Sequence, residues 1–173
     1  MQPFDLQHRV RDLVEATIQR MGFDLVAVEW TTSGRIGLLR LSIDGSGGIT
    51  ASDCATVSRA VEPLLDADDP IQGRYRLEVS SPGIERPVQR LQDFERFRGY
   101  KLRLRLEKGP PRRRYTGVLE GVDGDEVLLR ADDTLHRFHQ DTIERAHLDL
   151  TLEEYQALSH PGPARQEDDH DHE

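Results

Sequence analysis

The sequence predicts an α+β protein with an N-terminal α-β-β-α-β sandwich followed by a small β-barrel. Apolar residues recur at helical spacing near the start of the chain and again after residue 50, with alternating, strand-like runs between and after them. After residue 87 the pattern changes to short strands separated by close turn signals. Two prolines within residues 82–87 separate the two patterns and place a boundary near residue 88.

The first part begins with an amphipathic helix that ends at Gly22. Its apolar residues recur every three or four positions, at Val10, Leu13, Val14, Ile18 and Met21. Two β-rich runs follow, residues 23–31 and 35–44, and the Thr-Ser-Gly between them is typical of a turn. The sequence therefore predicts a helix followed by an antiparallel hairpin.

A glycine-rich turn and a second helix come next. The turn at residues 45–48 lacks the lysine of a phosphate-binding loop and the spacing of the dinucleotide fingerprint, so a plain strand-to-helix turn is favoured over a phosphate site. Thr50 and Asp53 have the spacing of a capping box. We expect Pro63 to kink the helix or end it early. The predicted inward residues are Cys54, Val57, Val61, Leu64 and Leu65.

Residues 74–88 are expected to join the two parts. Apolar and charged residues alternate from 74 to 79, which predicts a third strand with one apolar face. Pro82 and Gly83 fit the central positions of a type II turn, in which Gly83 has a positive φ. No long helix can start before about Leu91, because Pro87 removes a further backbone donor. The predicted junction residues are Ser80, Ser81, Pro82, Gly83, Arg86 and Pro87.

The second part is expected to be a small closed barrel of five short strands. A helical entry at 93–97 precedes a strand at 101–107, in which leucines alternate with charged residues. Turn signals separate four more strand candidates, at residues 115–122, 126–131, 134–138 and 147–150. A short helix is expected at 151–158, and disorder beyond Ser159. The predicted domains are residues 1–88, residues 89–152 and an acidic tail of residues 153–173.

The net charge of −9 is distributed unevenly along the chain. From Thr151 onward seven acids oppose one arginine, a balance of −6. Between residues 101 and 115 seven basic residues oppose one acid, a balance of +6. The seven basic residues are Lys101, Arg103, Arg105, Lys108, Arg112, Arg113 and Arg114.

This basic segment has two interpretations. Charged residues on the solvent face of a strand are common and need not bind anything. RNA binding is favoured by the loop after the strand, where prolines stiffen the chain and three arginines offer planar donor groups to phosphates. We predict an RNA-binding surface on the seven basic residues, with Arg74, Arg76 and Arg86 as further candidates.

The sequence indicates no catalytic residue, no metal site and no cofactor. Ser80 and Ser81 lack the motif of a nucleophile elbow, and no histidine has a reason to lie beside them. The single cysteine, Cys54, lies among apolar helix positions and is expected to belong to the core. His170 and His172 lie among acids in the tail and would chelate a metal only weakly.

Residues 77–87 read Leu-Glu-Val-Ser-Ser-Pro-Gly-Ile-Glu-Arg-Pro, which resembles the signature of the bacterial ribosome maturation factor RimP family. The likeness extends through residues 22–26, 39–44 and 48–54 to 69–71, and Val88 departs from the leucine expected after the last proline. The resemblance implies an SH3-like or Sm-like barrel in the second part. It also implies an assembly factor for the small (30S) ribosomal subunit.

The expected partner is therefore the free, immature small subunit, contacted through ribosomal RNA and a small-subunit ribosomal protein. No apolar run approaches the ~18 residues of a membrane span and no export signal is recognisable, so we expect a cytoplasmic monomer without membrane contact. A general RNA-binding or Sm-like oligomerising module, without a role specific to the ribosome, remains the alternative. A serine hydrolase is a more distant one.

Overall fold

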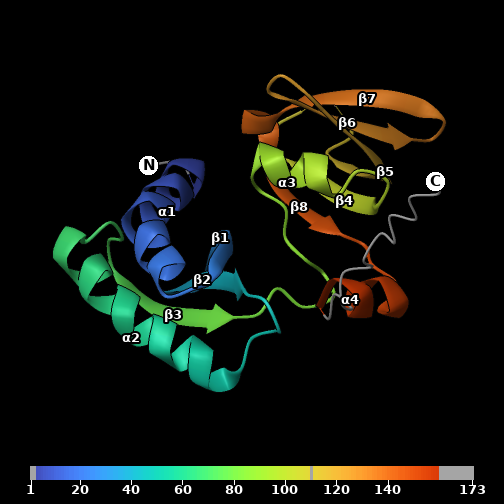
Figure 1. The fold of residues 1–173 in the computed structure, drawn as a ribbon. Helices are drawn as coiled ribbons and strands as arrows, with labels where there is room; N and C mark the ends of the chain where they lie inside the picture. Colours follow the sequence, from blue (N-terminus) through green and yellow to red (C-terminus); the bar gives the residue numbers. More distant parts are fainter. Residues whose placement is uncertain (1–2, 110, 160–173) are drawn as a thin grey trace, which may run out of the picture.

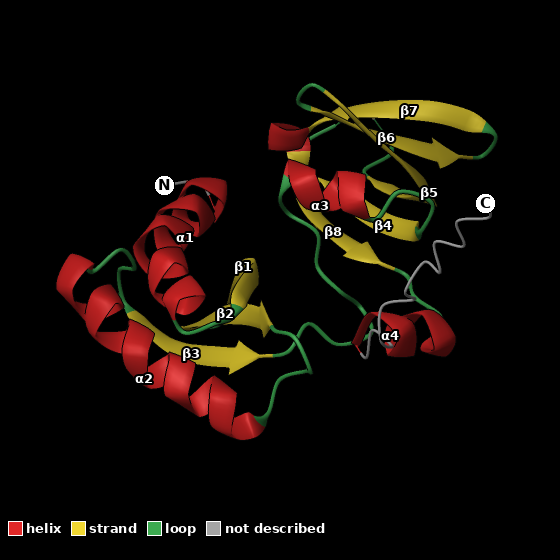
Figure 2. Ribbon diagram, viewed as in Figure 1, coloured by secondary structure: helices red, strands yellow, loops and turns green. Residues whose placement is uncertain are grey.

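The computed structural model describes residues 3–109 and 111–159 and has a mixed α+β fold with two sheets (Figures 1 and 2). A three-stranded sheet and two helices form the first body, residues 3–80. A five-stranded sheet and two short helices form the second body, residues 91–159. Residues 81–90, here called the connector, join the two bodies, and each body has its own hydrophobic core.

The first body has the predicted order of helices and strands. Its elements are α1 (Pro3–Arg20), β1 (Asp24–Ser33), β2 (Ile36–Asp44), α2 (Ala51–Asp68) and β3 (Arg74–Ser80). The expected hairpin is confirmed, because β1 and β2 pair antiparallel. β3 pairs parallel with the other side of β2, and α2 supplies the crossover that a parallel pair requires.

Both helices pack on the same apolar face of the three-stranded sheet. α1 contacts β1 and α2, and α2 contacts β3. Strand alternation places the polar residues of β2 and β3 on the opposite face, which neither α1 nor α2 covers. Burial of each large aliphatic side chain contributes about 1.5–3 kcal/mol. The buried residues include Val10, Val14, Ile18, Leu39, Leu41, Val57, Val61 and Leu65.

The second helix starts as predicted and ends later than predicted. The Thr50 side chain accepts from the Asp53 backbone N–H at 3.1 Å, and the Asp53 carboxylate accepts from the Thr50 N–H at 2.9 Å. The expectation that Pro63 ends the helix early is wrong, because the helix continues to Asp68. Pro63 is exposed while Val61 and Leu65 are buried, so core packing offsets the ~3 kcal/mol cost of an interior proline.

The second body is mainly antiparallel β-structure. Its sheet has the order β7-β6-β5-β4-β8. The last strand begins at Ile143, earlier than the predicted His147. The elements are α3 (Leu91–Arg96), β4 (Lys101–Leu106), β5 (Arg114–Asp123), β6 (Glu126–Ala131), β7 (Thr134–His139), the 3-10 turn η1 (Gln140–Thr142), β8 (Ile143–Leu148) and α4 (Leu152–Ser159).

The expected closed barrel is not formed in the part of the chain that the structure describes. No ladder joins β7 to β8, so the sheet remains open. The connector instead occupies the second edge of β8, where the Val88 N–H donates to the Ala146 carbonyl at 2.9 Å and the Leu148 N–H donates to the Arg86 carbonyl at 2.8 Å. Strand β8 is therefore enclosed between β4 and the connector.

Candidate functional site

The predicted junction residues lie in or directly before the connector. Gly83 has φ 71°, which confirms the positive φ expected of it. Ser80 is the last residue of β3, and Ser81 is exposed. Pro87 forms a bridge with His147 of β8. The connector thus turns at Gly83 and pairs with β8 at residues 86–88.

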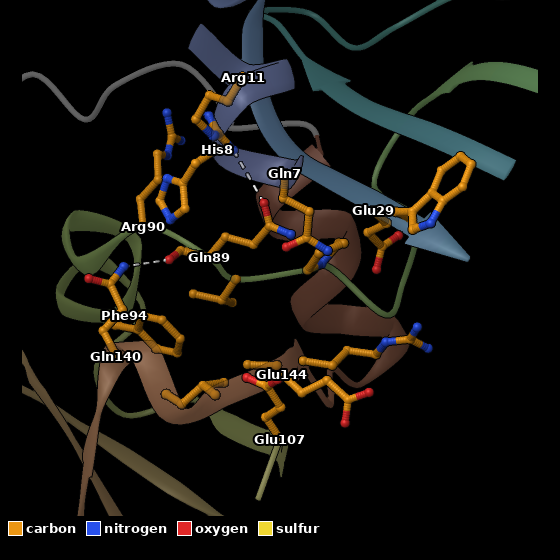
Figure 3. A pocket seen from close by; sticks show the side chains of 16 residues that line it. Gln7, His8, Arg11, Glu29, Gln89, Arg90, Phe94, Glu107, Gln140 and Glu144 are labelled. Atoms are coloured by element: carbon orange, nitrogen blue, oxygen red, sulfur yellow. Dashed lines mark hydrogen bonds between the residues drawn. The ribbon is translucent and has the colours of Figure 1, made fainter. Parts of the chain in front are cut away.

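Two cavities lie beside the connector. The first, of about 350 Å³, is called the Ser80 cavity and lies against the helix-free face of the three-stranded sheet. The second, of about 370 Å³, is called the Trp30 cavity and lies between α1, β1 and the start of β8 (Figure 3). Glu29, Pro87 and Arg145 line both cavities, so the two are neighbours along the junction of the bodies.

A histidine that was not predicted from the sequence lines the Ser80 cavity. Ser80, Ser81 and His147 line it together. His147 Nε2 lies 3.2 Å from the Glu29 carboxylate, and within the described residues neither serine hydroxyl bonds to a histidine. A serine nucleophile needs a base within hydrogen-bond reach, so this geometry does not activate either serine.

Acid–base pairs join the first body to the connector and to β8, and the first body supplies their acids. The Arg90 guanidinium donates two hydrogen bonds to the Asp24 carboxylate in a bidentate pair, at 3.1 and 3.0 Å. Arg86 donates to Asp44 at 2.8 Å. His147 and Glu29 form another pair, although 118 positions separate them in the sequence. The first body is therefore the acidic side of this junction.

A side-chain amide adds a further contact across the junction. The Gln89 amide nitrogen donates to the Val28 carbonyl at 2.7 Å, and its oxygen accepts from the Val28 N–H at 2.9 Å. Gln89 therefore pairs with β1 as a neighbouring strand would. On the other side, the Gln140 side chain donates to the Gln89 carbonyl at 2.9 Å (Figure 3).

The ion pairs shift the pKa values of their members. The His147 hydrogen bond lowers the pKa of Glu29 below its ordinary value, against the opposing effect of burial. Burial raises the pKa of Asp24, but the hydrogen bonds and charge of Arg90 outweigh it and lower the pKa overall. Burial likewise lowers the pKa of Arg90, and its bonds to Asp24 and Asp93 raise it overall. The charged forms of all three groups are thus the stable ones.

Arg86 is buried at the junction between the two bodies. Only 6% of the residue is exposed, and its guanidinium lies 5.2 Å from the centre of the Phe97 ring. Its Nε is buried without a hydrogen-bond partner among the described residues. A buried guanidinium already paired with Asp44 presents no donor to a phosphate, so we place Arg86 with the connector and not with an RNA surface.

Strand β4 presents the predicted basic stripe. Lys101, Arg103 and Arg105 alternate with buried leucines and are exposed. The strand register adds two arginines on the same face, because Arg105 lies opposite Arg114 of β5 and opposite Arg145 of β8. These five residues, Lys101, Arg103, Arg105, Arg114 and Arg145, are called the basic face.

Much of the basic face is paired with surface carboxylates. Lys101 lies 3.3 Å from Asp149, and Arg103 lies 2.9 Å from Glu85. Arg105 lies 3.0 Å from Glu144. Exposed pairs of this kind contribute about 0–1 kcal/mol, so a phosphate can replace a carboxylate at little cost.

The loop after β4 is held against the second body. Arg113 donates to the carbonyls of Leu106 at 3.1 Å and Glu107 at 2.6 Å. Arg112 pairs with Asp132, and its guanidinium lies 4.5 Å from the centre of the Tyr115 ring. Lys108 and Arg114 are exposed. Arg112 and Arg113 are therefore held against the second body rather than extended into solvent.

Arg74 and Arg76 lie apart from the basic face. Both are exposed on β3 and alternate with core residues, which places them on the helix-free face of the three-stranded sheet. On that face Arg40 of β2 pairs with Glu78 at 3.2 Å, and both of these residues line the Ser80 cavity. The Ser80 cavity thus lies between the helix-free face and β8.

The described residues contain no cluster of His, Cys, Asp and Glu side chains able to hold a metal ion. His170 and His172 lie outside the described residues. Cys54 is half-buried beside the first core, and burial raises the pKa of its thiol. None of the helices described is long and apolar enough to cross a membrane.

Sequence comparison identifies the first body. Residues 13–85 match the family model of the RimP N-terminal domain. The matched segment runs from α1 through β3 and includes Ser80, Ser81 and Gly83. The matched segment ends within the connector. The basic face therefore lies outside the match, as do the residues of the second body that line the two cavities.

Proposed function

The chain belongs to the RimP family of ribosome maturation factors, and on that premise we propose that it binds the free, immature small (30S) ribosomal subunit and leaves before translation. The observation that carries this proposal is the match of residues 13–85 to the RimP N-terminal domain. RimP is not a known enzyme family, and the proposed role is one of binding. The proposed setting is the cytoplasm, with the protein acting as a monomer.

The proposed contact with ribosomal RNA is the basic face together with the loop after β4. Register supports it, since the strand pairing gathers Lys101, Arg103 and Arg105 with Arg114 and Arg145 on one exposed face. Arg112, Arg113 and Lys108 lie next to this face in sequence and extend it. Arg74 and Arg76 offer a second, separate contact on the helix-free face.

We also propose the division into domains that underlies this binding mode. Residues 1–88 form an α-β-β-α-β sandwich, residues 89–152 a small SH3-like or Sm-like unit, and residues 153–173 an acidic tail. The two separate cores support the first two units. A ribosomal protein and the RNA would then be contacted by different units, held at a fixed angle by the junction ion pairs.

Sedimentation of cell extracts tests the proposed function. The protein should travel with free small subunits and be absent from complete ribosomes. A deletion strain should accumulate immature small subunits, and the wild-type gene should reverse this. Distribution over all RNA fractions, with normal subunit profiles in the deletion strain, would instead support a general RNA-binding module.

A further inference from the structure

Strand β1 is an edge strand, and part of its edge is unpaired. Its neighbour in the sheet is β2, so one side of β1 faces away from the sheet. In an antiparallel ladder, alternate residues direct their N–H and C=O groups outward. Val28 directs both groups outward, because its N–H and its C=O both bond to the Gln89 side chain. The pairing of β1 with β2 has no register shift between Val28 and Ser33, so the backbone groups of Trp30 and Thr32 also point outward.

Side chains cover only the first half of this edge. Arg11 donates to the Leu25 carbonyl at 2.9 Å and the Val26 carbonyl at 3.3 Å, and Gln89 pairs with Val28. Beyond Val28 this covering stops. In the described structure the outward groups of Trp30 and Thr32 have no hydrogen-bond partner, and Thr32 is exposed.

The Trp30 cavity adjoins the end of this covering, since Arg11, Gln89 and Trp30 all line it. Glu29 and Trp30 form its β1 side, and Figure 3 shows Glu107 and Glu144 on the side away from Arg11. Neighbouring contacts show what this edge accepts, because residues 86–88 pair by their backbone with β8 and the Gln89 side-chain amide pairs with the backbone of β1. A second extended segment beside Trp30 would continue the same arrangement.

We propose that the edge of β1 at Trp30 and Thr32 binds an extended segment of a protein partner, which adds to the sheet as a strand and directs a lysine or arginine to Glu107. Backbone groups that donate and accept alternately are complemented by another peptide backbone. Glu107 is half-buried at the cavity and makes no ion pair within the described residues. Arg11, Arg90 and Arg145 also line the cavity, so the choice of a peptide over RNA rests on the outward N–H and C=O groups of the edge, which match a peptide backbone.

The edge is tested first with a synthetic hexapeptide that alternates valine and lysine, added to the full chain. Amide exchange of Trp30 and Thr32 should slow by about tenfold or more at saturation. The Thr31 amide, which the ladder directs toward β2, serves as the internal reference. The same peptide N-methylated at its valines should give no protection. Equal effects of both peptides, or no protection by either, would overturn the proposal.

A matched pair of variants locates the contact. Thr32→Pro removes the outward N–H, and a proline is tolerated on a strand edge where that N–H faces solvent. Thr32→Val keeps the N–H and changes only the side chain. Thr32→Pro should weaken peptide binding by about tenfold or more, with Thr32→Val near wild type. Glu107→Gln should weaken binding of the lysine peptide but not of its serine-substituted counterpart.

Binding to free small ribosomal subunits tests whether the partner strand comes from the subunit. This experiment rests on the proposed function. Thr32→Pro should bind them more weakly than Thr32→Val. If the two variants bind equally while the peptide distinguishes them, the partner strand does not come from the subunit. If wild-type protein fails to bind subunits at all, the proposed function fails, and the peptide experiment still decides whether the edge binds a strand.

Discussion

Arg90 is the residue on which most of the charged contacts at the junction converge. It reaches Asp24 of β1, Asp93 of α3 at 2.6 Å and Glu15 of α1 at 3.7 Å, while only 17% of its side chain is exposed. The network therefore links α1, β1 and α3 through one guanidinium. Breaking a partly buried network costs more than removing an exposed pair, because the remaining charges stay desolvated.

Arg90→Met tests this convergence. The variant should lower the free energy of unfolding by about 2–3 kcal/mol, since Asp93 would remain buried without its partner. Arg9→Met is the matched control, because the Arg9–Asp68 pair is exposed and should contribute less than about 1 kcal/mol. Urea denaturation measures both. Equal losses in the two variants would show that the Arg90 network does not stabilise the fold.

Acid should weaken the junction through Asp24 and Glu29. Both carboxyl groups have lowered pKa values in the folded protein, from ordinary values of 3.8 and 4.5. Their contribution is complete above those ordinary values and is lost as the pH falls through the lowered ones. Thermal melting between pH 7 and pH 3 should show this loss. The double variant Asp24→Asn, Glu29→Gln should depend less on pH over the acid range; an unchanged dependence would contradict this assignment.

Among the elements of the fold, the connector requires a left-handed backbone conformation at one residue, Gly83. Gly83 has φ 71°, and a Cβ there would meet no atom within 4 Å. A substitution at this position is therefore penalised by the backbone and not by a steric clash.

Gly83→Val should reduce stability by about 1–3 kcal/mol, because a β-branched residue resists positive φ. Gly83→Asn should lose less, because asparagine tolerates the left-handed region. Urea denaturation compares the two variants, and subunit binding reports whether the bodies keep their relative orientation. Equal stability of wild type and Gly83→Val would show that the turn does not constrain the connector.

The loop after β4 should control the salt dependence of RNA binding. Each phosphate contact contributes about 0.7–0.9 to the slope of log affinity against log salt. Replacing Arg112, Arg113 and Arg114 by serine should flatten the slope by about two units if all three exchange their present partners for phosphates.

The matched control replaces Lys101, Arg103 and Arg105 by serine. If those three residues form only a solvated strand face, the control should change the slope less than the loop variant does. An unchanged slope in the loop variant would exclude these arginines from the RNA contact and leave Arg74 and Arg76 as the candidates.

At the scale of the whole molecule, the junction is a polar interface to which the first body contributes most of the paired carboxylates. Asp24, Glu29 and Asp44 come from the first body, and their partners come from the connector and β8. The connector also closes the edge of β8, so it acts as a structural strand as well as a link. The angle between the proposed RNA surface and the β1 edge is thus set by residues of the connector.

The local features of this protein follow from its amino-acid sequence. Hydrophobic periodicity placed α1, α2 and the strands of both sheets except the start of β8. The Thr50–Asp53 spacing predicted the capping box, and Pro-Gly predicted the positive φ of Gly83. Each of these depends on residues within a few positions of one another, so their physical causes can be read directly along the chain.

The remaining features depend on contacts between residues far apart in the sequence. Pro63 remains inside α2 because of packing against a distant sheet, and β8 leaves the barrel open because the connector takes its second edge. The Glu29–His147 pair, the Gln89–Val28 pairing and the position of Arg145 opposite Arg105 join residues far apart in sequence. Such contacts depend on strand register and on the angle between the two bodies, and neither leaves a periodic signal in the sequence.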